Sequence, residues 1–175
     1  MIHKTTELSR PVELRSVLEN EEISLDIRAT AEECRALAKR FDILEVEDLN
    51  AFLTIRPGAN PALITVEGEI MAHVVQACCV TLAPVKEVVQ DSFSDLLTTD
   101  PELLGSDEEE DEDSDKPVEL IRSDNIDIGE IVAQWLSLAL NPYPRSDAPL
   151  YEHVEQNTES GTHTPLDVLG NLKGK

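Results

Sequence analysis

Hydrophobic and polar residues alternate in two long stretches of this chain, and a period of two predicts strands with one buried face. The first apolar row occupies alternate positions from 49 to 55, and the second, longer row runs from 64 to 74. Residues 57–61 between them include two prolines, a glycine and an asparagine, which favour a turn. The pattern therefore predicts an antiparallel hairpin.

Further strands are predicted on both sides of this hairpin. Residues 10–28 hold two short β-like runs, and the second of them alternates from Ile23 to Ile27. Residues 84–97 form a less regular run that we also interpret as a strand. Gly68 lies inside the longest strand, where a glycine predicts a bulge or a bend.

Two segments follow the helical period of 3.6 residues. A helix is predicted over about residues 31–41, with a capping box formed by Thr30 and Glu33 at its start. A second helix is predicted over residues 127–140, with Asp127 as its cap and an Asn-Pro-Tyr-Pro sequence at its end. Their apolar faces are formed by Cys34, Leu37, Ala38 and Phe41, and by Ile128, Ile131, Val132, Trp135 and Ala139.

These elements predict a single α+β domain over residues 1–145. Its sheet is expected to be antiparallel, strongly bent and of about five or six strands, with barrel-like closure as an open alternative. The two main helices should cover the open face or the ends of the sheet. Residues 146–175 are expected to form a flexible C-terminal tail with a short docking segment near 165–173.

Charge is the strongest global signal, because 36 acidic residues stand against 14 basic ones, giving a net charge of −22. Ten of the acids occur between residues 100 and 115, so 100–117 is predicted to be a disordered acidic insertion between strands. Without those ten acids the net charge would still be −12, so the folded part is acidic as well. Such a field repels phosphate backbones, which disfavours direct binding of DNA or RNA, and attracts basic surfaces.

No segment of the sequence is typical of a membrane protein or of a secreted one. The longest uncharged apolar-rich stretch, residues 70–85, is interrupted by polar residues and is too short to span a bilayer. Nothing resembles a signal peptide, and three cysteines, two of them adjacent, do not form a secreted disulfide framework. We therefore expect a cytoplasmic protein without membrane association.

Motifs of common enzymes and cofactor sites are absent from the sequence. It contains no glycine-rich phosphate loop, no P-loop lysine motif and no nucleophile elbow. Its four histidines have no partner at metal-ligand spacing, and the acidic run lacks the turn glycine of a calcium loop. We expect no catalytic residues, no cofactor and no metal site.

One segment nevertheless carries a family resemblance. Val66-Glu67-Gly68-Glu69-Ile70, followed by Gln76-Ala77-Cys78-Cys79-Val80-Thr81-Leu82-Ala83-Pro84, resembles the central motif of the YceD-type bacterial proteins. That motif consists of a glycine, an extended strand, two cysteines separated by two residues, a leucine and a proline. After an acidic insertion, three further segments resemble the family in the family's order: 125–130, 138–145 and 165–173. The resemblance covers roughly residues 8–173.

The chain departs from the family pattern at the second cysteine. Cys78 matches the first cysteine, Thr81 stands at the second, and Cys79 falls inside the gap, which resembles the variant common among alphaproteobacterial members. A threonine hydroxyl is a poor zinc ligand, so we expect a structural or partner-binding role for the motif. The alternative from the residues alone is that the cysteines are small buried apolar groups.

The resemblance implies a role in ribosome biogenesis, in which large-subunit (23S) ribosomal RNA fails to accumulate without the protein. In many genomes the family's gene neighbours that of a small basic ribosomal protein. Combined with the acidity, this predicts a non-enzymatic factor that binds a basic ribosomal protein or an assembly factor and reaches ribosomal RNA indirectly. Two alternatives stay open: an RNA-processing enzyme, and direct RNA binding through Arg35, Lys39, Arg40 and the Arg145 region.

The candidate partner-binding surface comprises the end of the long strand and the turn after it, with the start and the end of the second helix. The alternative is that these residues only fix the fold, as proline turns, a helix cap and small buried groups. The residues are Gln76, Cys78, Thr81, Leu82, Pro84, Asn125, Asp127, Pro142, Pro144 and Arg145.

Overall fold

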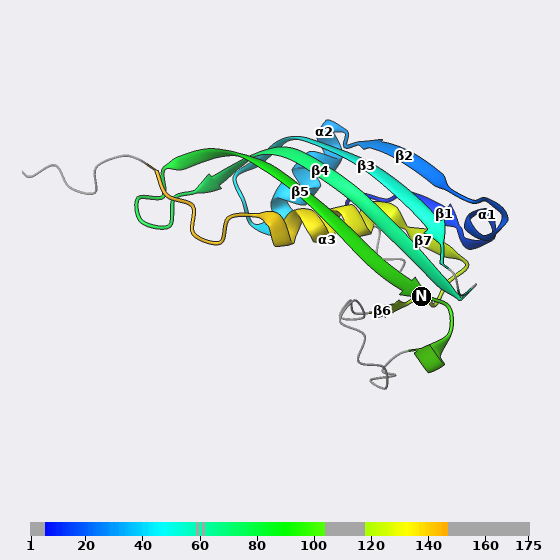
Figure 1. The fold of residues 1–175 in the computed structure, drawn as a ribbon. Helices are drawn as coiled ribbons and strands as arrows, with labels where there is room; N and C mark the ends of the chain where they lie inside the picture. The colour runs from blue at the N-terminus through cyan, green and yellow to red at the C-terminus, as the bar shows by residue number, and fades with distance from the viewer. Residues whose placement is uncertain (1–5, 59, 61, 104–117, 147–175) are drawn as a thin grey trace, which may run out of the picture.

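A computed structural model describes residues 6–58, 60, 62–103 and 118–146 of the chain. The fold is α+β, as the sequence predicts, with one five-stranded sheet, a separate two-stranded sheet and two main helices (Figure 1). The large sheet arches over both helices, so its concave face is buried.

The large sheet has the order β2-β3-β4-β5-β6, and its first four strands pair antiparallel. The last strand pairs parallel to β5, so the expectation of a purely antiparallel sheet is wrong at this edge. A parallel neighbour requires a long connection, and the chain between β5 and β6 supplies one. The strands are β2 (Ile23–Arg28), β3 (Glu45–Pro57), β4 (Leu63–Ala77), β5 (Pro84–Thr98) and β6 (Val118–Leu120).

The sheet is open, and the barrel-like alternative is wrong. Among the described residues β2 pairs only with β3, and β6 pairs only with β5, so the two ends of the sheet do not meet. Barrel closure would require pairing between the first and last strands. The concave face is closed instead by helices.

The predicted hairpin is confirmed as β3 and β4, but its irregularity lies elsewhere than expected. The register shifts between Val46 and Asp48, whereas the pairing around Gly68 is regular. The bulge moves Val46 onto the buried face three residues before Leu49, which breaks the alternation at the start of β3. Of the two alternatives predicted at Gly68, a bulge or a bend, the bulge is therefore wrong.

Gly68 has a different role, because it makes room for an aromatic ring. It lies opposite Phe93 of β5, and a Cβ added to Gly68 would lie 2.7 Å from Phe93 Cζ. The Phe93 ring stacks on Trp135, with ring centroids 5.2 Å apart. The absence of a side chain at Gly68 thus allows the stack that joins the sheet to the second main helix.

The N-terminal region differs most from its prediction. The sequence predicts two β-like runs in residues 10–28. The second is β2, but the first is the three-residue strand β1 (Pro11–Glu13), followed by helix α1 (Leu14–Glu19). β1 pairs with β7 (Asn125–Asp127) in the small sheet. Only Val17 of α1 is buried, so this short helix has no periodic apolar signature.

Both main helices are confirmed, as α2 (Ala31–Phe41) and α3 (Ile128–Ala139). The capping box at the start of α2 is also present: Thr30 Oγ1 accepts from the Glu33 N–H, and the Glu33 carboxylate accepts from the Thr30 N–H. Apolar residues of both helices belong to the same core cluster as those of β3, β4 and β5. Burial on one face of the sheet thus produces the hydrophobic core.

The predictions for the low-complexity segments fall mostly outside the described residues. Residues 101–103 of the predicted disordered insertion form a 3-10 helix, η1 (Pro101–Leu103), whereas 104–117 lie outside the described residues. The predicted tail and its docking segment also lie outside them, beyond residue 146. No helix among the described residues is long and apolar enough to cross a membrane.

Gly129, in the first turn of α3, provides a test of the packing between this helix and the N-terminal segment. A Cβ at this position would lie 2.7 Å from Leu8 O and 2.9 Å from Arg10 N, both backbone atoms that cannot rotate away. We expect Gly129→Ala to lower the free energy of unfolding by about 1–3 kcal/mol, measured by urea denaturation.

The matched control is Ser137→Ala on the exposed face of α3. It should change the free energy of unfolding by less than about 0.5 kcal/mol. Equal stabilities of the Gly129 variant and the unaltered protein would contradict this packing.

Candidate functional site

A tight turn joins β4 to β5 and contains the cysteine motif. The Cys78 N–H donates to Ala83 O at 2.8 Å, and the Leu82 N–H donates to Cys78 O at 2.9 Å. Leu82 has a φ of 59° and is 77% exposed. A leucine in the left-handed region is uncommon and strained, so the surrounding hydrogen bonds must hold this backbone shape.

The chain that follows α3 packs against this turn. Gln76 Nε2 donates to Asn141 O at 3.0 Å, and the Cys79 N–H donates to Pro144 O at 2.8 Å. The Ser146 N–H lies 3.4 Å from Cys78 Sγ. Residues 76–84 and 141–146 thus form one surface, which we call the turn surface.

Eight of the ten predicted partner-binding residues lie in the turn surface. They come from two segments that are more than fifty residues apart in the sequence, which β4 and α3 bring to the same end of the fold (Figure 1). The eight are Gln76, Cys78, Thr81, Leu82, Pro84, Pro142, Pro144 and Arg145.

The other two predicted residues, Asn125 and Asp127, lie in β7 instead. Asp127 occupies the N-cap position of α3, but its side chain makes no cap hydrogen bond, so the predicted side-chain cap is wrong. Its carboxylate accepts instead from the Arg10 N–H at 2.7 Å, from Ser9 Oγ at 2.8 Å and from Thr6 Oγ1 at 3.0 Å. Asp127 therefore anchors the N-terminal segment.

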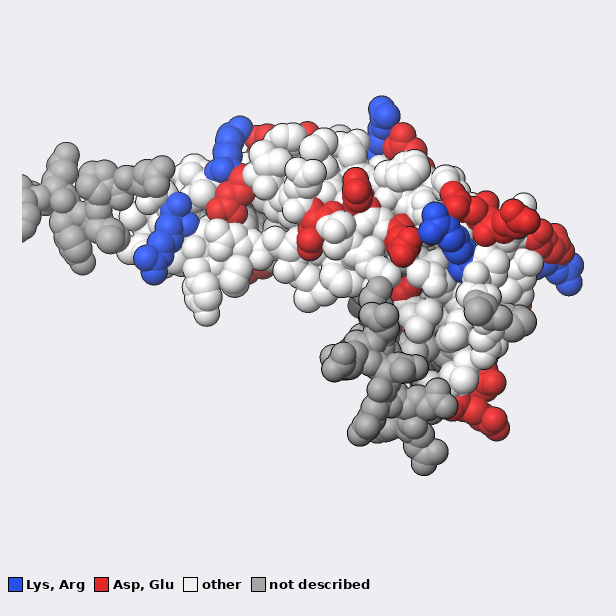
Figure 2. Space-filling model, in the orientation of Figure 1, with Lys and Arg blue, Asp and Glu red and all other residues white. Residues whose placement is uncertain are grey.

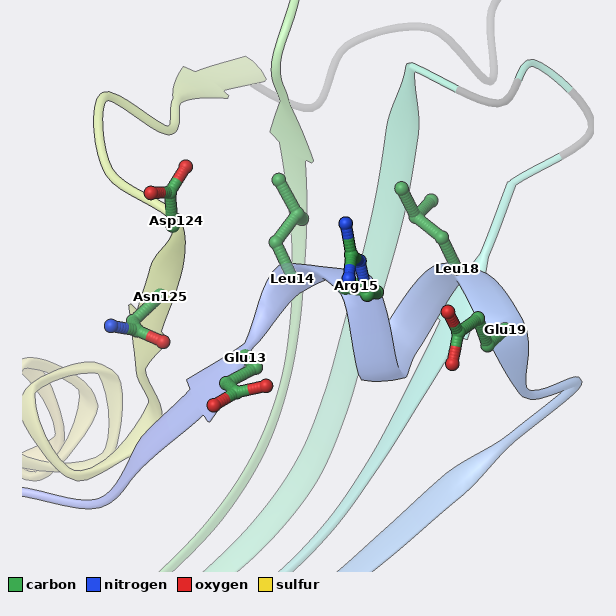
Figure 3. A pocket seen from close by; sticks show the side chains of 7 residues that line it. All are labelled: Glu13, Leu14, Arg15, Leu18, Glu19, Asp124 and Asn125. Carbon is green, nitrogen blue, oxygen red and sulfur yellow. The ribbon is translucent and has the colours of Figure 1, made fainter.

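Asn125 borders a hollow of about 670 Å³ between the start of β7 and helix α1. Figure 3 shows Asp124 and Asn125 on one side and α1 on the other. The lining includes two glutamates and one arginine but no serine, cysteine or histidine that could act as a nucleophile with its base: Glu13, Leu14, Arg15, Leu18, Glu19, Asp124 and Asn125. This hollow gives no reason to assign a reaction.

Cys78 has the most perturbed electrostatic environment of the turn surface. Cys78 is 1% exposed. Hydrogen bonds lower the pKa of its thiol to about 6, the largest effect coming from the Thr81 hydroxyl and smaller ones from the N–H groups of Ser146, Thr81 and Val80. These donors stabilise the thiolate more than burial opposes it. These hydrogen bonds favour the thiolate form and connect Cys78 to the backbone of residues 80, 81 and 146.

Gln76 is the other buried polar residue of the turn surface, at 7% exposed. Its Nε2 donates a hydrogen bond to Asn141 O, while its Oε1 is buried without a partner among the described residues. Asn141 and Ser146 also belong to this surface, although neither is among the residues predicted from the sequence. Asn141 lies in the Asn-Pro-Tyr-Pro sequence and could have been included, but a backbone contact from Ser146 leaves no signal in the sequence.

The described residues offer no metal site. They contain no group of three or more histidine, cysteine, aspartate or glutamate side chains that could hold an ion, and all three cysteines are free. His73, on the convex face of β4, has its Nδ1 3.0 Å from both carboxylate oxygens of Asp48.

The positive side chains of the described residues are dispersed, and half of them pair with acids. Figure 2 shows the lysines and arginines on one face standing apart from one another. Within the described ranges, five of the ten lysine and arginine side chains lie within 4.0 Å of a carboxylate: Arg10, Arg28, Arg40, Arg56 and Lys86.

Arg40, one of the four candidate RNA contacts, is held by two carboxylates. It makes two hydrogen bonds to Glu130, at 2.6 and 2.7 Å, and a third to Glu7 at 3.0 Å, which together raise the pKa of its guanidinium. Arg35 on the same helix donates its Nε–H to Ala31 O. A phosphate would have to compete with these carboxylates for Arg40.

The fold and the turn surface together define an open-faced α+β protein whose described residues hold no catalytic constellation. Residues 66–173, more than half of the chain, match the family described as "Large ribosomal RNA subunit accumulation protein YceD". The chain belongs to this family, one of ribosome biogenesis factors without known catalytic activity. No curated protein and no solved structure matches the chain.

The acidity constant of Cys78 can be tested directly. In a titration of thiolate ultraviolet absorbance under reducing conditions, we expect one transition near pH 6, because the pKa of this thiol is lowered to about 6. Cys78→Ser should abolish that transition, whereas Cys79→Ser, which removes an exposed thiol, should preserve it.

The same shift has a consequence for stability. The pKa of Cys78 in the folded protein lies below the unfolded value of about 8.5. The thiolate therefore contributes fully to the free energy of unfolding above about pH 8.5, and this contribution is lost as pH falls through about 6. The difference in unfolding free energy between the unaltered protein and Cys78→Ser should therefore grow as pH rises over this range. A pH-independent difference would contradict the assignment.

Proposed function

We propose that this protein is a non-enzymatic ribosome biogenesis factor that supports accumulation of 23S ribosomal RNA by binding a basic protein. The partner would be a ribosomal protein of the large subunit or another assembly factor. Ribosomal RNA would be reached indirectly, through that partner. Membership of the family supports a role in ribosomal RNA accumulation, and the negative charge of the folded part supports a positively charged partner.

The observation that carries the proposal is the acidity of the folded residues. The described part of the chain holds 23 acidic side chains against 10 basic ones, so its negative charge does not depend on the acidic insertion. A field of this sign speeds encounter with a basic protein and disfavours approach of bare RNA. The pairing of Arg40 with Glu130 and Glu7 supports the same choice of partner.

Basic ribosomal proteins bind RNA non-specifically when they are free, because their positive side chains neutralise phosphates. An acidic binding partner would occupy such side chains until the protein reaches its specific site. This would raise the yield of correctly assembled large subunits and thereby preserve their RNA. No bond is made or broken in this role, which fits the lack of a catalytic constellation among the described residues.

The test is a binding experiment with the immobilised full chain. We expect it to capture basic proteins from an RNA-free mixture of large-subunit ribosomal proteins at about 0.05 M salt, and to release most of them at about 0.5 M salt, where charges are strongly screened. Purified 23S RNA without proteins should not bind under either condition.

A charge-reversed variant, Arg35→Glu with Lys39→Glu, separates this proposal from direct RNA binding. Both residues lie on α2 among the candidate RNA contacts, and they have no carboxylate partner within 4.0 Å among the described residues. We expect the variant to capture ribosomal proteins as well as the unaltered chain does. Capture of bare RNA that disappears in this variant would replace the proposal by direct RNA binding.

A further inference from the structure

Strand β5 has one edge that is almost unpaired. It pairs with β4 along its whole length, from Pro84 to Thr98, but with β6 only at Leu96–Thr98. Within the part of the chain that the structure describes, no other segment pairs with this second edge. Figure 1 shows β5 at the margin of the sheet, with β6 only at its far end.

The direction of the backbone groups along this edge follows from the ladder with β4. Two hydrogen bonds bracket the ladder, from the Cys78 N–H to Ala83 O and from the Thr99 N–H to Ala62 O, and the register between them has no shift. Bonded and non-bonded pairs alternate in an antiparallel ladder, so the odd-numbered residues of β5 bond to β4. The even-numbered residues direct their N–H and C=O groups outward.

Three of these residues form an open stretch: Lys86, Val88 and Gln90. All three are exposed, and Val88 is 61% exposed although it is apolar. At the next outward position, Ser92, the N–H already donates to Asp91 Oδ1 at 2.9 Å. The open stretch thus begins after the β4–β5 turn and ends at Ser92, whose outward N–H is already hydrogen-bonded to the Asp91 side chain.

A groove of about 420 Å³ runs beside this open stretch, between the edge of β5 and the end of α3. Glu87 and Asp91 are its charged lining residues, and the Glu87 carboxylate accepts from Asn141 Nδ2 at 2.9 Å. Lys86 lies on the opposite, convex face, where it pairs with Glu47. Among the described residues, the lining of the groove therefore includes two carboxylates and no lysine or arginine. The full lining is Glu87, Val88, Val89, Gln90, Asp91, Ala139 and Asn141.

We infer that the edge of β5 from Lys86 to Gln90 binds an extended segment of a basic protein, which adds to the sheet as a further strand. The backbone of that segment would pair with the outward groups of the three residues, and its side chains on the groove side would meet Glu87, Val89 and Asp91. This inference rests on the proposed function and gives its partner a place and a sequence pattern.

The pattern follows from the period of two residues in a strand. Glu87 and Asp91 lie four positions apart on the groove side, with the buried Val89 between them. Residues of the added strand opposite them on the same face must also be four apart. The segment therefore has lysine or arginine at two positions separated by three residues, and an apolar residue midway.

Charge disfavours the other candidates for this edge. In a second copy paired antiparallel about Val89, Glu87 would lie opposite Asp91 of the other chain, and like charges directly opposite each other repel. The chain's own segments beyond the described residues also have the wrong sign. Residues 147–175 contain five acids against two lysines, and 104–117 contain eight acids against one lysine.

The probe is a fluorescent peptide, Thr-Lys-Thr-Val-Thr-Lys-Thr, titrated against the full chain at low ionic strength. The control peptide, Thr-Thr-Lys-Lys-Val-Thr-Thr, has the same composition without the spacing. We expect the first to bind about tenfold more tightly, because only its lysines can reach Glu87 and Asp91 together. It should also slow amide exchange at Lys86, Val88 and Gln90, which exchange fast in the free protein.

Two pairs of variants separate edge pairing from general charge attraction. Val88→Pro removes an outward N–H without removing a bond to β4, and should weaken peptide binding about tenfold, whereas Val88→Thr keeps the N–H and should bind within about twofold of the unaltered chain. Glu87→Gln with Asp91→Asn keeps the hydrogen-bond acceptors and should also weaken binding about tenfold. The charge-matched control, Glu67→Gln with Glu69→Gln on exposed positions of β4, should bind within about twofold.

Several results would overturn the inference. They are equal binding of the two peptides, equal effects of the two charge variants, or slow exchange at Val88 in the free protein, which would mean that the chain itself or a second copy already covers the edge. Should Val88→Pro fail to fold, the charge variants decide. Peptide binding at the edge without capture of any ribosomal protein would refute the proposed function alone, and capture without peptide binding would refute only the edge.

Discussion

One-sided burial of the arched sheet is the constraint on which this structure depends. Apolar rows of β3, β4 and β5 face α2 and α3, while no described helix covers the convex face. At β5 the contact is specific: Phe93 stacks on Trp135, whose Nε1 donates to Asp95 at 2.7 Å. A buried face fixes the register, since a shift by one residue would turn every apolar side chain outward. The long, regular ladder between β4 and β5 is a result of that constraint.

Elements with a strong local period could be predicted from the sequence, and those that depend on distant partners could not. The ladder of β3 and β4 and the helix α2 with its capping box each leave a signature within a few residues. Strand β1 is three residues long and exists through its pairing with β7, more than a hundred residues away. The direction of β6 depends likewise on the course of the connection before it, which carries no periodic signal.

The turn surface illustrates the same division. The family motifs in the sequence indicate its two segments, and the structure places them in contact through Gln76 with Asn141 and Cys79 with Pro144. No pattern in the sequence indicated that Asn125 and Asp127 lie elsewhere, because their neighbourhood is set by the N-terminal segment. The lowered pKa of Cys78 was also invisible, since its donors include backbone N–H groups whose directions depend on the fold.

The carboxylate of Asp127 has a consequence for the order of events during synthesis of the chain. Its partners, Thr6, Ser9 and Arg10, leave the ribosome more than a hundred residues before it does. Strands β2 to β5 can pair while translation continues, because they are neighbours along the chain. These three residues, by contrast, have to remain without their contacts to Asp127 until the start of α3 emerges. Thr6, Ser9 and Arg10 are therefore among the last described residues to make their native contacts.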